Sequence, residues 1–121
     1  MAKIREEFPT LKILLGAVVA LGPGKVALLE AVDRTGSITG AAREMGMSYR
    51  RAWKLVDAMN GDFKSPLVIK NAGGAGGGGA RVTDAGFGAL NRYRSMEDKA
   101  GQAVRQEVSD FAALLNPPPK D

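Results

Sequence analysis

The chain has 121 residues, of which 45% are hydrophobic, and it contains neither cysteine nor histidine. This composition predicts one globular domain with its own core, and it excludes disulfides, zinc fingers and any cysteine or histidine nucleophile. The formal net charge is +4, but residues 43–94 alone carry nine basic and four acidic side chains. The basic ones are Arg43, Arg50, Arg51, Lys54, Lys64, Lys70, Arg81, Arg92 and Arg94. A basic segment of this kind is typical of proteins that bind a polyanion.

The first twenty residues are expected to form a terminus and one apolar element. We interpret residues 1–9 as a flexible N-terminus. Residues 10–20 are rich in Leu, Ile and Val and are interpreted as a strand, although a buried helix has the same pattern. The apolar run 13–21 is too short to span a bilayer, and the acidic Glu6 and Glu7 before it are atypical of a signal peptide. We therefore expect a cytoplasmic protein with no membrane partner.

Residues 25–35 predict a first helix. Pro23 suits a first helical turn, and Gly36 closes the segment. The side chains expected to face inward are Val26, Leu29, Ala31 and Val32.

Residues 36–60 predict two more helices separated by a tight turn. Ser37 and Ser48 are candidate N-caps, and Gly46 stands where a left-handed residue ends a helix. Apolar residues recur at helical spacing in both segments, first Ile38, Ala41, Ala42 and Met45, then Ala52, Leu55, Val56 and Met59. Short helices joined by such a turn predict a helix-turn-helix.

The outward face of the second of these helices is cationic. Arg50, Lys54 and Asp57 lie opposite the apolar stripe, with Arg51 to one side. Residues near the N-terminus of a recognition helix reach base edges in the major groove, and Arg suits guanine. A solvated cationic face is the alternative interpretation.

Two aromatic residues lie beside that stripe. Trp53 is the only tryptophan, and we expect it to pack in the core rather than to stack on a base. For Tyr49, a core-edge position and a DNA contact through its hydroxyl both stay open. Ser48 can act as a cap and as a phosphate ligand together, because a helix N-terminus favours anions.

Residues 67–70 and 80–82 predict two short strands around a glycine-rich loop. Residues 73–79 hold six glycines. A nucleotide-binding phosphate loop would need Lys-Ser/Thr directly after its last glycine, but Gly79 is followed by Ala80-Arg81-Val82. The pattern therefore predicts a β-hairpin wing. Lys70, Asn71 and Arg81 flank the loop as candidate phosphate ligands.

Residues 83–115 predict a long helix that Thr83-Asp84 caps. It would measure about 50 Å at 1.5 Å per residue, which outruns a core of this size. Its apolar seam therefore predicts pairing with the same helix of a second chain. The expected dimerisation residues are Leu90, Tyr93, Ala100, Val104, Val108 and Phe111. Residues 116–121, with three prolines, are expected to be a disordered tail.

The predicted fold is mainly α with a small β part. It is a winged helix-turn-helix over residues 10–82, a three-helix bundle with a hairpin wing and an N-terminal strand, followed by the dimerisation helix.

Several motifs in this order resemble the N-terminal DNA-binding domain of ModE-type, molybdate-responsive regulators, which are related through their winged helix to LysR-type regulators. They are Gly36-Ser37-Ile38 through Ala41-Ala42, then Ser48-Tyr49 and Ala52-Trp53, and finally the glycine wing with Val82-Thr83-Asp84-Ala85-Gly86. The resemblance covers roughly residues 12–110.

The resemblance implies a homodimeric transcription regulator that reads an inverted repeat of double-stranded DNA. The third helix would enter the major groove and the wing would touch the backbone. The expected DNA-binding residues are Ser37, Thr39, Ser48, Tyr49, Arg50, Arg51, Lys54, Lys70, Asn71 and Arg81. Full-length regulators of this type carry C-terminal oxyanion-binding modules, for which we expect no room here. Molybdate thus enters only through the resemblance, and no cofactor is predicted.

Other classes of function have less support in the sequence. The carboxylates show no spacing suited to acid–base work or to a metal site, so we expect no enzyme. The rivals are a winged-helix protein-interaction module and a small molybdate-binding protein, neither of which would bind DNA.

Overall fold

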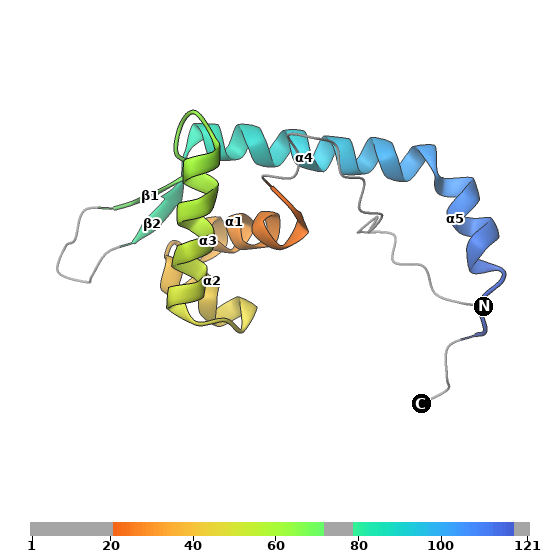
Figure 1. The fold of residues 1–121 in the computed structure, drawn as a ribbon, viewed down its shortest axis with the longest axis horizontal. Coiled ribbons are helices and arrows are strands. Elements are labelled where there is room, and N and C mark those ends of the chain that lie inside the picture. Colours follow the sequence, from red (N-terminus) through yellow and green to blue (C-terminus); the bar gives the residue numbers. More distant parts are fainter. Residues whose placement is uncertain (1–20, 72–78, 118–121) are drawn as a thin grey trace. The chain divides into compact units, whose positions relative to one another are not determined.

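The structure is a computed structural model that describes residues 21–71 and 79–117. Its elements are α1 (Pro23–Thr35), α2 (Ile38–Met45), α3 (Tyr49–Asp62), β1 (Val68–Lys70), β2 (Ala80–Val82), α4 (Asp84–Ala103) and α5 (Arg105–Ala112) (Figure 1). The mainly helical winged helix-turn-helix is therefore confirmed. The predicted strand at 10–20, the terminus 1–9, most of the glycine loop and residues 118–121 lie outside the described residues.

Local signals set the ends of α1 and α2 as predicted. Gly36 has φ 74° and its N–H donates to the Val32 carbonyl at 2.8 Å. Gly46 has φ 68°, a left-handed conformation that glycine adopts without steric cost. The Ser37 hydroxyl accepts from Gly40 N–H at 2.8 Å and so caps α2. These contacts hold the turns on both sides of α2.

The boundaries of two helices differ from the prediction by two residues. Helix α1 begins at Pro23 rather than at residue 25, because proline is tolerated in the first turn and its N–H is not needed there. Helix α3 continues through Gly61 to Asp62, where a break was expected after Asn60. An isolated glycine lowers helix propensity by about 1 kcal/mol and does not by itself end a helix.

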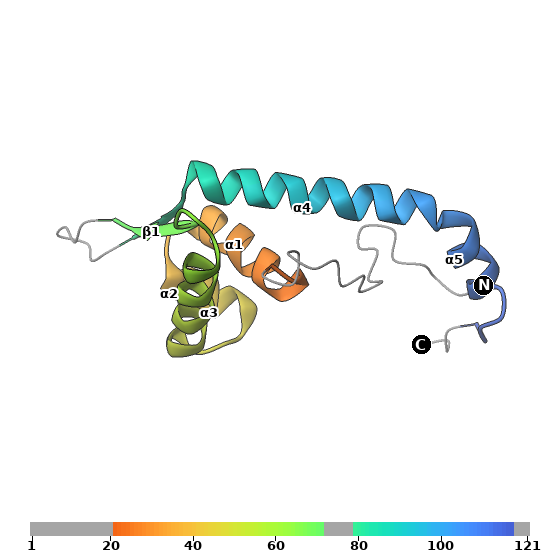
Figure 2. The same cartoon turned by 45° about the horizontal axis from the view of Figure 1, so that its top comes forward.

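Helices α1, α2 and α3 bury their apolar faces against one another and lie together in both views (Figures 1 and 2). The inward residues predicted for α1 are all fully buried, and Leu28 joins them. In α2 and α3 the predicted stripes are buried except at Met45 and Leu55, which are partly exposed and pack at the edge of the core. Arg34 and Glu44 form a two-pronged ion pair between α1 and α2, with the closer contact at 2.7 Å.

The hairpin pairs Val68 with Val82, Ile69 with Arg81 and Lys70 with Ala80 in antiparallel register. Because side chains alternate along a strand, Val82 and Ala80 share the buried face and Arg81 lies on the other one. The Ala80 N–H also donates to the Gly36 carbonyl at 2.9 Å. This bond fixes the base of the wing to the turn between α1 and α2.

Helix α4 starts where Thr83 closes the wing. The Thr83 hydroxyl accepts from Gly86 N–H at 3.0 Å and donates to the Pro66 carbonyl at 2.7 Å. The predicted cap is therefore present, and it also joins the helix to the segment before β1.

The long helix predicted over residues 83–115 is divided into two helices, α4 and α5. The helix is interrupted at Val104, which has φ −110° and ψ 12°, whereas Gly86, Gly88 and Gly101 stay within α4. Helices gain most of their stability from packing an apolar face, and the side chains of Gln102, Ala103 and Arg105 around the break are exposed.

The predicted dimerisation residues fall into two groups. Leu90 and Tyr93 are each only 8% exposed and belong to the core cluster of the winged-helix unit, which ends at Tyr93. Their side chains therefore have little surface left for a second chain, which corrects their predicted role. In the unit that contains residues 94–117, Ala100 and Val104 are partly buried, whereas Val108 and Phe111 are exposed.

Candidate nucleic-acid interface

The exposed face of α3 carries three cations. Arg50, Arg51 and Lys54 are exposed, whereas Ala52, Val56 and Met59 on the other side of the helix are buried. Arg50 and Lys54 are four residues apart, so they stack on one face, one turn from each other. The predicted outward orientation of these cations is therefore confirmed.

The beginning of α3 is fixed by its predicted cap. The Ser48 hydroxyl accepts from Arg51 N–H at 3.1 Å, and Ser48 itself is exposed. Tyr49 follows in the first turn with 46% of its surface exposed. Tyr49 is therefore not part of the core cluster, and a DNA contact through its hydroxyl stays a prediction.

Trp53 packs against the core from a partly buried position, as expected, and it also contacts the wing. The Lys70 ammonium lies 4.0 Å from the centroid of the Trp53 ring and 6.0 Å from that of Tyr49. Both distances allow the attraction between a cation and an aromatic face. Lys70, predicted as a phosphate ligand beside the glycine loop, therefore reaches back from β1 to α3.

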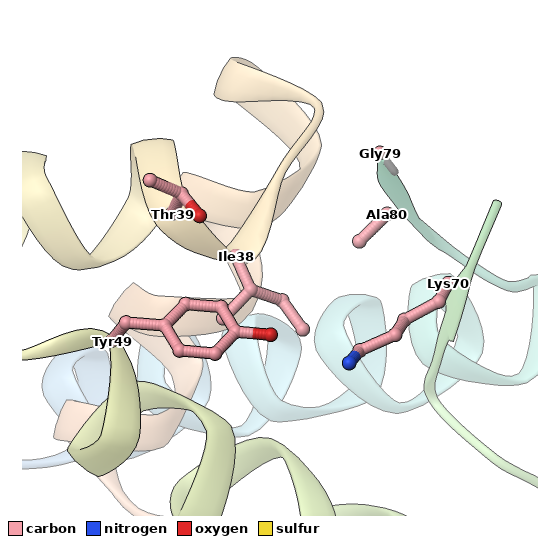
Figure 3. A pocket seen from close by; sticks show the side chains of 6 residues that line it. All are labelled: Ile38, Thr39, Tyr49, Lys70, Gly79 and Ala80. Carbon is pink, nitrogen blue, oxygen red and sulfur yellow. The ribbon is translucent and has the colours of Figure 1, made fainter. Parts of the chain in front are cut away.

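A small cavity opens between α2, α3 and the wing. It is lined by Ile38, Thr39, Tyr49, Lys70, Gly79 and Ala80 and has a volume of about 210 Å³. We call this cavity the notch. Figure 3 shows the Tyr49 hydroxyl and the Lys70 ammonium pointing toward each other across it. Three predicted DNA-binding residues, Thr39, Tyr49 and Lys70, thus come together from three elements.

The other predicted contact residues do not line the notch. The Ser37 hydroxyl is engaged in capping α2. Asn71 is exposed, and its backbone N–H donates to the Gly79 carbonyl at 2.7 Å. Arg81 lies on the face of the hairpin opposite Ala80. The interface therefore has separate parts, namely the α3 cations, the notch and the outer face of the wing.

Sequence reasoning missed two positioning contacts. The Trp53–Lys70 pair was not predicted, although Tyr49 and Trp53 stand four residues apart and share a helix face. Asn60 was also missed: its amide bonds the backbone of Leu67 and Val68. No local sequence pattern predicts either contact, because each depends on how the hairpin packs against α3.

Comparison with known proteins gives the family. Residues 24–87 match the bacterial regulatory helix-turn-helix protein of the lysR family, a region that spans α1 to the start of α4. The chain belongs to this LysR family of helix-turn-helix regulators. The match includes the caps, the α3 cations and the wing strands described above, so the predicted family relationship is confirmed.

Several curated relatives of this LysR-type chain carry names that refer to molybdenum. The molybdenum-pterin-binding protein MopB of Rhodobacter capsulatus is 45% identical over 101 residues, which cover 84% of this chain and 36% of that protein. The molybdenum transport protein ModE of Azotobacter vinelandii is 44% identical over 78 residues, covering 64% of this chain and 29% of that protein. The DNA-binding transcriptional dual regulator ModE of Escherichia coli is 37% identical over 94 residues, covering 78% and 36%. The LysR-type chain spans about a third of the length of these relatives.

The described residues, 21–71 and 79–117, hold no cluster of metal ligands and no membrane-spanning helix. No group of three or more acidic, histidine or cysteine side chains among them could hold a metal ion. Within the same residues, no helix has the length and apolar character needed to cross a membrane.

Proposed function

We propose that this chain is a sequence-specific DNA-binding transcription regulator of the ModE type. The observation that carries the proposal is the exposed face of α3, where Arg50, Arg51 and Lys54 project from a helix whose other side is buried. In helix-turn-helix proteins the second helix of the motif lies in the major groove, and the residues near its N-terminus contact the base edges. Arg50 and Lys54 are the residues that we assign to base or phosphate contact there.

The wing supplies contacts outside the major groove. Arg81 is exposed on the outer face of the hairpin, and Asn71 is exposed at the end of β1. Contacts from such residues to phosphates set the register of a protein on the duplex without reading its sequence. We assign Arg81 and Asn71 to this role, and Ser37 and Ser48 to the positioning of the helix ends.

A homodimer that reads an inverted repeat is the assembly we propose. On α5, Val108 is 41% and Phe111 65% exposed, and Leu114 just beyond it is 80% exposed. Exposed apolar residues in series mark an interaction surface. Two recognition helices of such a dimer should lie about 34–36 Å apart, one turn of the duplex. A role on chromosomal DNA also implies a cytoplasmic location.

The regulated genes are proposed to concern molybdenum, because MopB of Rhodobacter capsulatus is named for molybdenum-pterin binding and ModE of Azotobacter vinelandii for molybdenum transport. Other relatives, such as the transcriptional regulator ModE of Yersinia pestis, are named as regulators, which points away from an enzyme. We assign no molybdate site and no cofactor to the described residues of this chain.

The test is a selection of genomic fragments that the purified chain retains, followed by gel-shift titration of the enriched fragments. The proposal predicts one enriched inverted repeat, and binding that weakens steeply with salt because each neutralised phosphate releases counterions. Equal retention of all fragments would contradict sequence-specific reading, and no retention at low salt would contradict DNA binding altogether.

A further inference from the structure

The notch has polar groups on opposite sides and an apolar floor. Thr39 contributes a hydroxyl from α2, Tyr49 a hydroxyl from α3, and Lys70 an ammonium group from β1. Ile38 and Ala80, which are each 3% exposed, form the floor. The volume of about 210 Å³ is many times the roughly 10–15 Å³ that one water molecule needs. A single tetrahedral phosphate group fits in this space together with some of its water.

The cationic side of the notch is held in place by Trp53. A lysine side chain is flexible and loses much rotamer freedom when it binds an anion. Here the Lys70 ammonium already lies 4.0 Å from the Trp53 ring centroid, so part of that ordering has taken place in the free protein. No described carboxylate forms an ion pair with Lys70. Its charge is therefore available to an incoming anion.

The walls of the notch are also fixed. The Ala80 N–H donates to the Gly36 carbonyl at 2.9 Å, which holds the wing against the start of α2. A Cβ atom on Gly79 would lie 3.0 Å from that same carbonyl oxygen and from the Asn71 amide nitrogen. The wing thus approaches the turn as closely as a glycine permits. The Ala80–Gly36 bond therefore fixes the wing relative to the start of α2, on which Thr39 lies.

We propose that the notch binds one phosphodiester group of the DNA backbone, with Lys70 as its charged ligand and the Thr39 and Tyr49 hydroxyls as donors. Trp53 acts as a positioning residue that orients Lys70. This inference rests on the proposed function. The backbone of DNA is the occupant, rather than a free anion, because the notch opens between the wing and the N-terminal end of α3, the two elements assigned to the duplex.

The bound phosphate would join the wing to α3 at the point where the helix enters the groove. Phosphate contacts carry no sequence information themselves but fix the register of a recognition helix. The notch therefore decides how deeply Arg50 and Lys54 reach, while Arg81, on the opposite face of the hairpin, contacts a different part of the backbone.

The experiment compares Lys70→Met with the matched control Lys64→Met, an exposed lysine between α3 and β1 that does not line the notch. Each variant is titrated with the fragment selected by the wild-type chain at several salt concentrations. Lys70→Met should weaken binding roughly tenfold at about 0.1 M salt and lower the slope of log K against log salt by about one, the values for one lost phosphate contact. Lys64→Met should change neither.

Trp53 gives a second set of variants and an optical signal. Trp53→Phe keeps an aromatic face and should keep the wild-type slope, whereas Trp53→Leu should reproduce the slope of Lys70→Met. Melting curves check that both variants fold. A further variant, Tyr49→Phe, loses only the notch hydroxyl and should weaken binding while keeping the wild-type slope, because Lys70 and Trp53 are both kept. Because Trp53 is the only tryptophan, its emission should change when duplex is added and should not change with an equal concentration of inorganic phosphate.

The outcomes separate this inference from the proposed function. If the wild-type chain binds DNA and Lys70→Met has the same salt slope, the proposal that the notch binds a phosphate is overturned and the proposed function stands. No salt-dependent binding by the wild-type chain overturns both. A change in Trp53 emission at a lower concentration of inorganic phosphate than of duplex assigns the notch to a free anion, and so overturns the DNA phosphate as its occupant.

Discussion

Asn60, in the last turn of α3, bonds both backbone groups of Val68 in β1. Its Nδ2 donates to the Val68 carbonyl at 2.9 Å, and its Oδ1 accepts from Val68 N–H at 3.1 Å. The same oxygen accepts from Leu67 N–H at 2.8 Å. The recognition helix and the wing are therefore joined at one end by this amide and at the other by the Lys70–Trp53 pair.

Replacing Asn60 with alanine should destabilise the fold by about 1–3 kcal/mol, because partly buried backbone groups lose their partners. Asn60→Asp keeps the two accepting contacts and loses the donor, so its loss should be smaller. Urea denaturation measures the free energy of unfolding of both variants. Asn91→Ala, at an exposed position on α4, is the control. Equal stability of Asn60→Ala and Asn91→Ala would show that the amide does not hold the strand.

Two glycines in the first turns of α4 should respond in opposite ways to alanine. A Cβ on Gly86 would lie 2.3 Å from the Leu67 carbonyl oxygen and 2.6 Å from a Val82 methyl group. On Gly88 it would meet only the end of the Arg92 side chain, at 3.4 Å. Gly86→Ala should therefore cost about 1–3 kcal/mol through overpacking, whereas Gly88→Ala should be neutral or stabilise the helix by up to about 1 kcal/mol. Thermal unfolding measures the stability of both variants. Similar losses of stability for the two would contradict the close packing of α4 against the Leu67 segment.

The ion pair between α1 and α2 should make the stability of the fold depend weakly on pH in the acidic range. The hydrogen bond and charge of Arg34 lower the pKa of Glu44, and the same hydrogen bond, which Arg34 donates to Glu44, raises the pKa of Arg34. A carboxyl whose pKa is lower in the folded state stabilises the fold above its unfolded pKa, about 4.3, and this contribution is lost as the pH falls through the folded value. Because both side chains are exposed, the effect should be small and salt-sensitive.

The measurement is the difference in melting temperature between wild type and Glu44→Gln, taken at neutral pH and again well below about pH 4. The difference should shrink at the acid end and at high salt. A difference that stays constant across the titration would mean that the pair contributes nothing through charge.

Substitutions in α4 and α5 should have different effects, one on the stability of the fold and the other on dimerisation. Leu90 is 8% exposed and Phe111 65% exposed. Leu90→Ala should destabilise the winged-helix unit by about 2–5 kcal/mol. Phe111→Ser should leave the melting temperature of the winged-helix unit unchanged. It should raise the concentration at which the protein dimerises, as measured by analytical ultracentrifugation. A Phe111→Ser protein that dimerises like wild type would remove α5 from the proposed interface.

Much of the winged helix could be predicted because its signals are local. Ser37, Ser48, Gly36 and Gly46 occupy the helix ends where capping and left-handed residues are required, and the apolar stripes have helical spacing. The outward position of Arg50 and Lys54 follows from the same periodicity.

The errors arose where tertiary packing decides. Leu90 and Tyr93 do not fit the predicted dimer seam, because the part of α4 that carries them belongs to the core. The break at Val104 carries no glycine or proline signal, and the notch depends on the approach of Gly79 to Gly36. Spacing along one element cannot reveal such contacts between elements.

The central claim, that the exposed cations of α3 bind duplex DNA, is tested most directly by gel shift with Arg50→Ala and Lys54→Ala. Their matched controls are Arg105→Ala and Lys99→Ala, at exposed positions elsewhere in the chain. We predict that each α3 variant loses specific affinity by about 1–3 kcal/mol, the value of a good base contact, with an unchanged melting temperature, while both controls bind like wild type. Equal binding by the α3 variants and their controls would contradict the account.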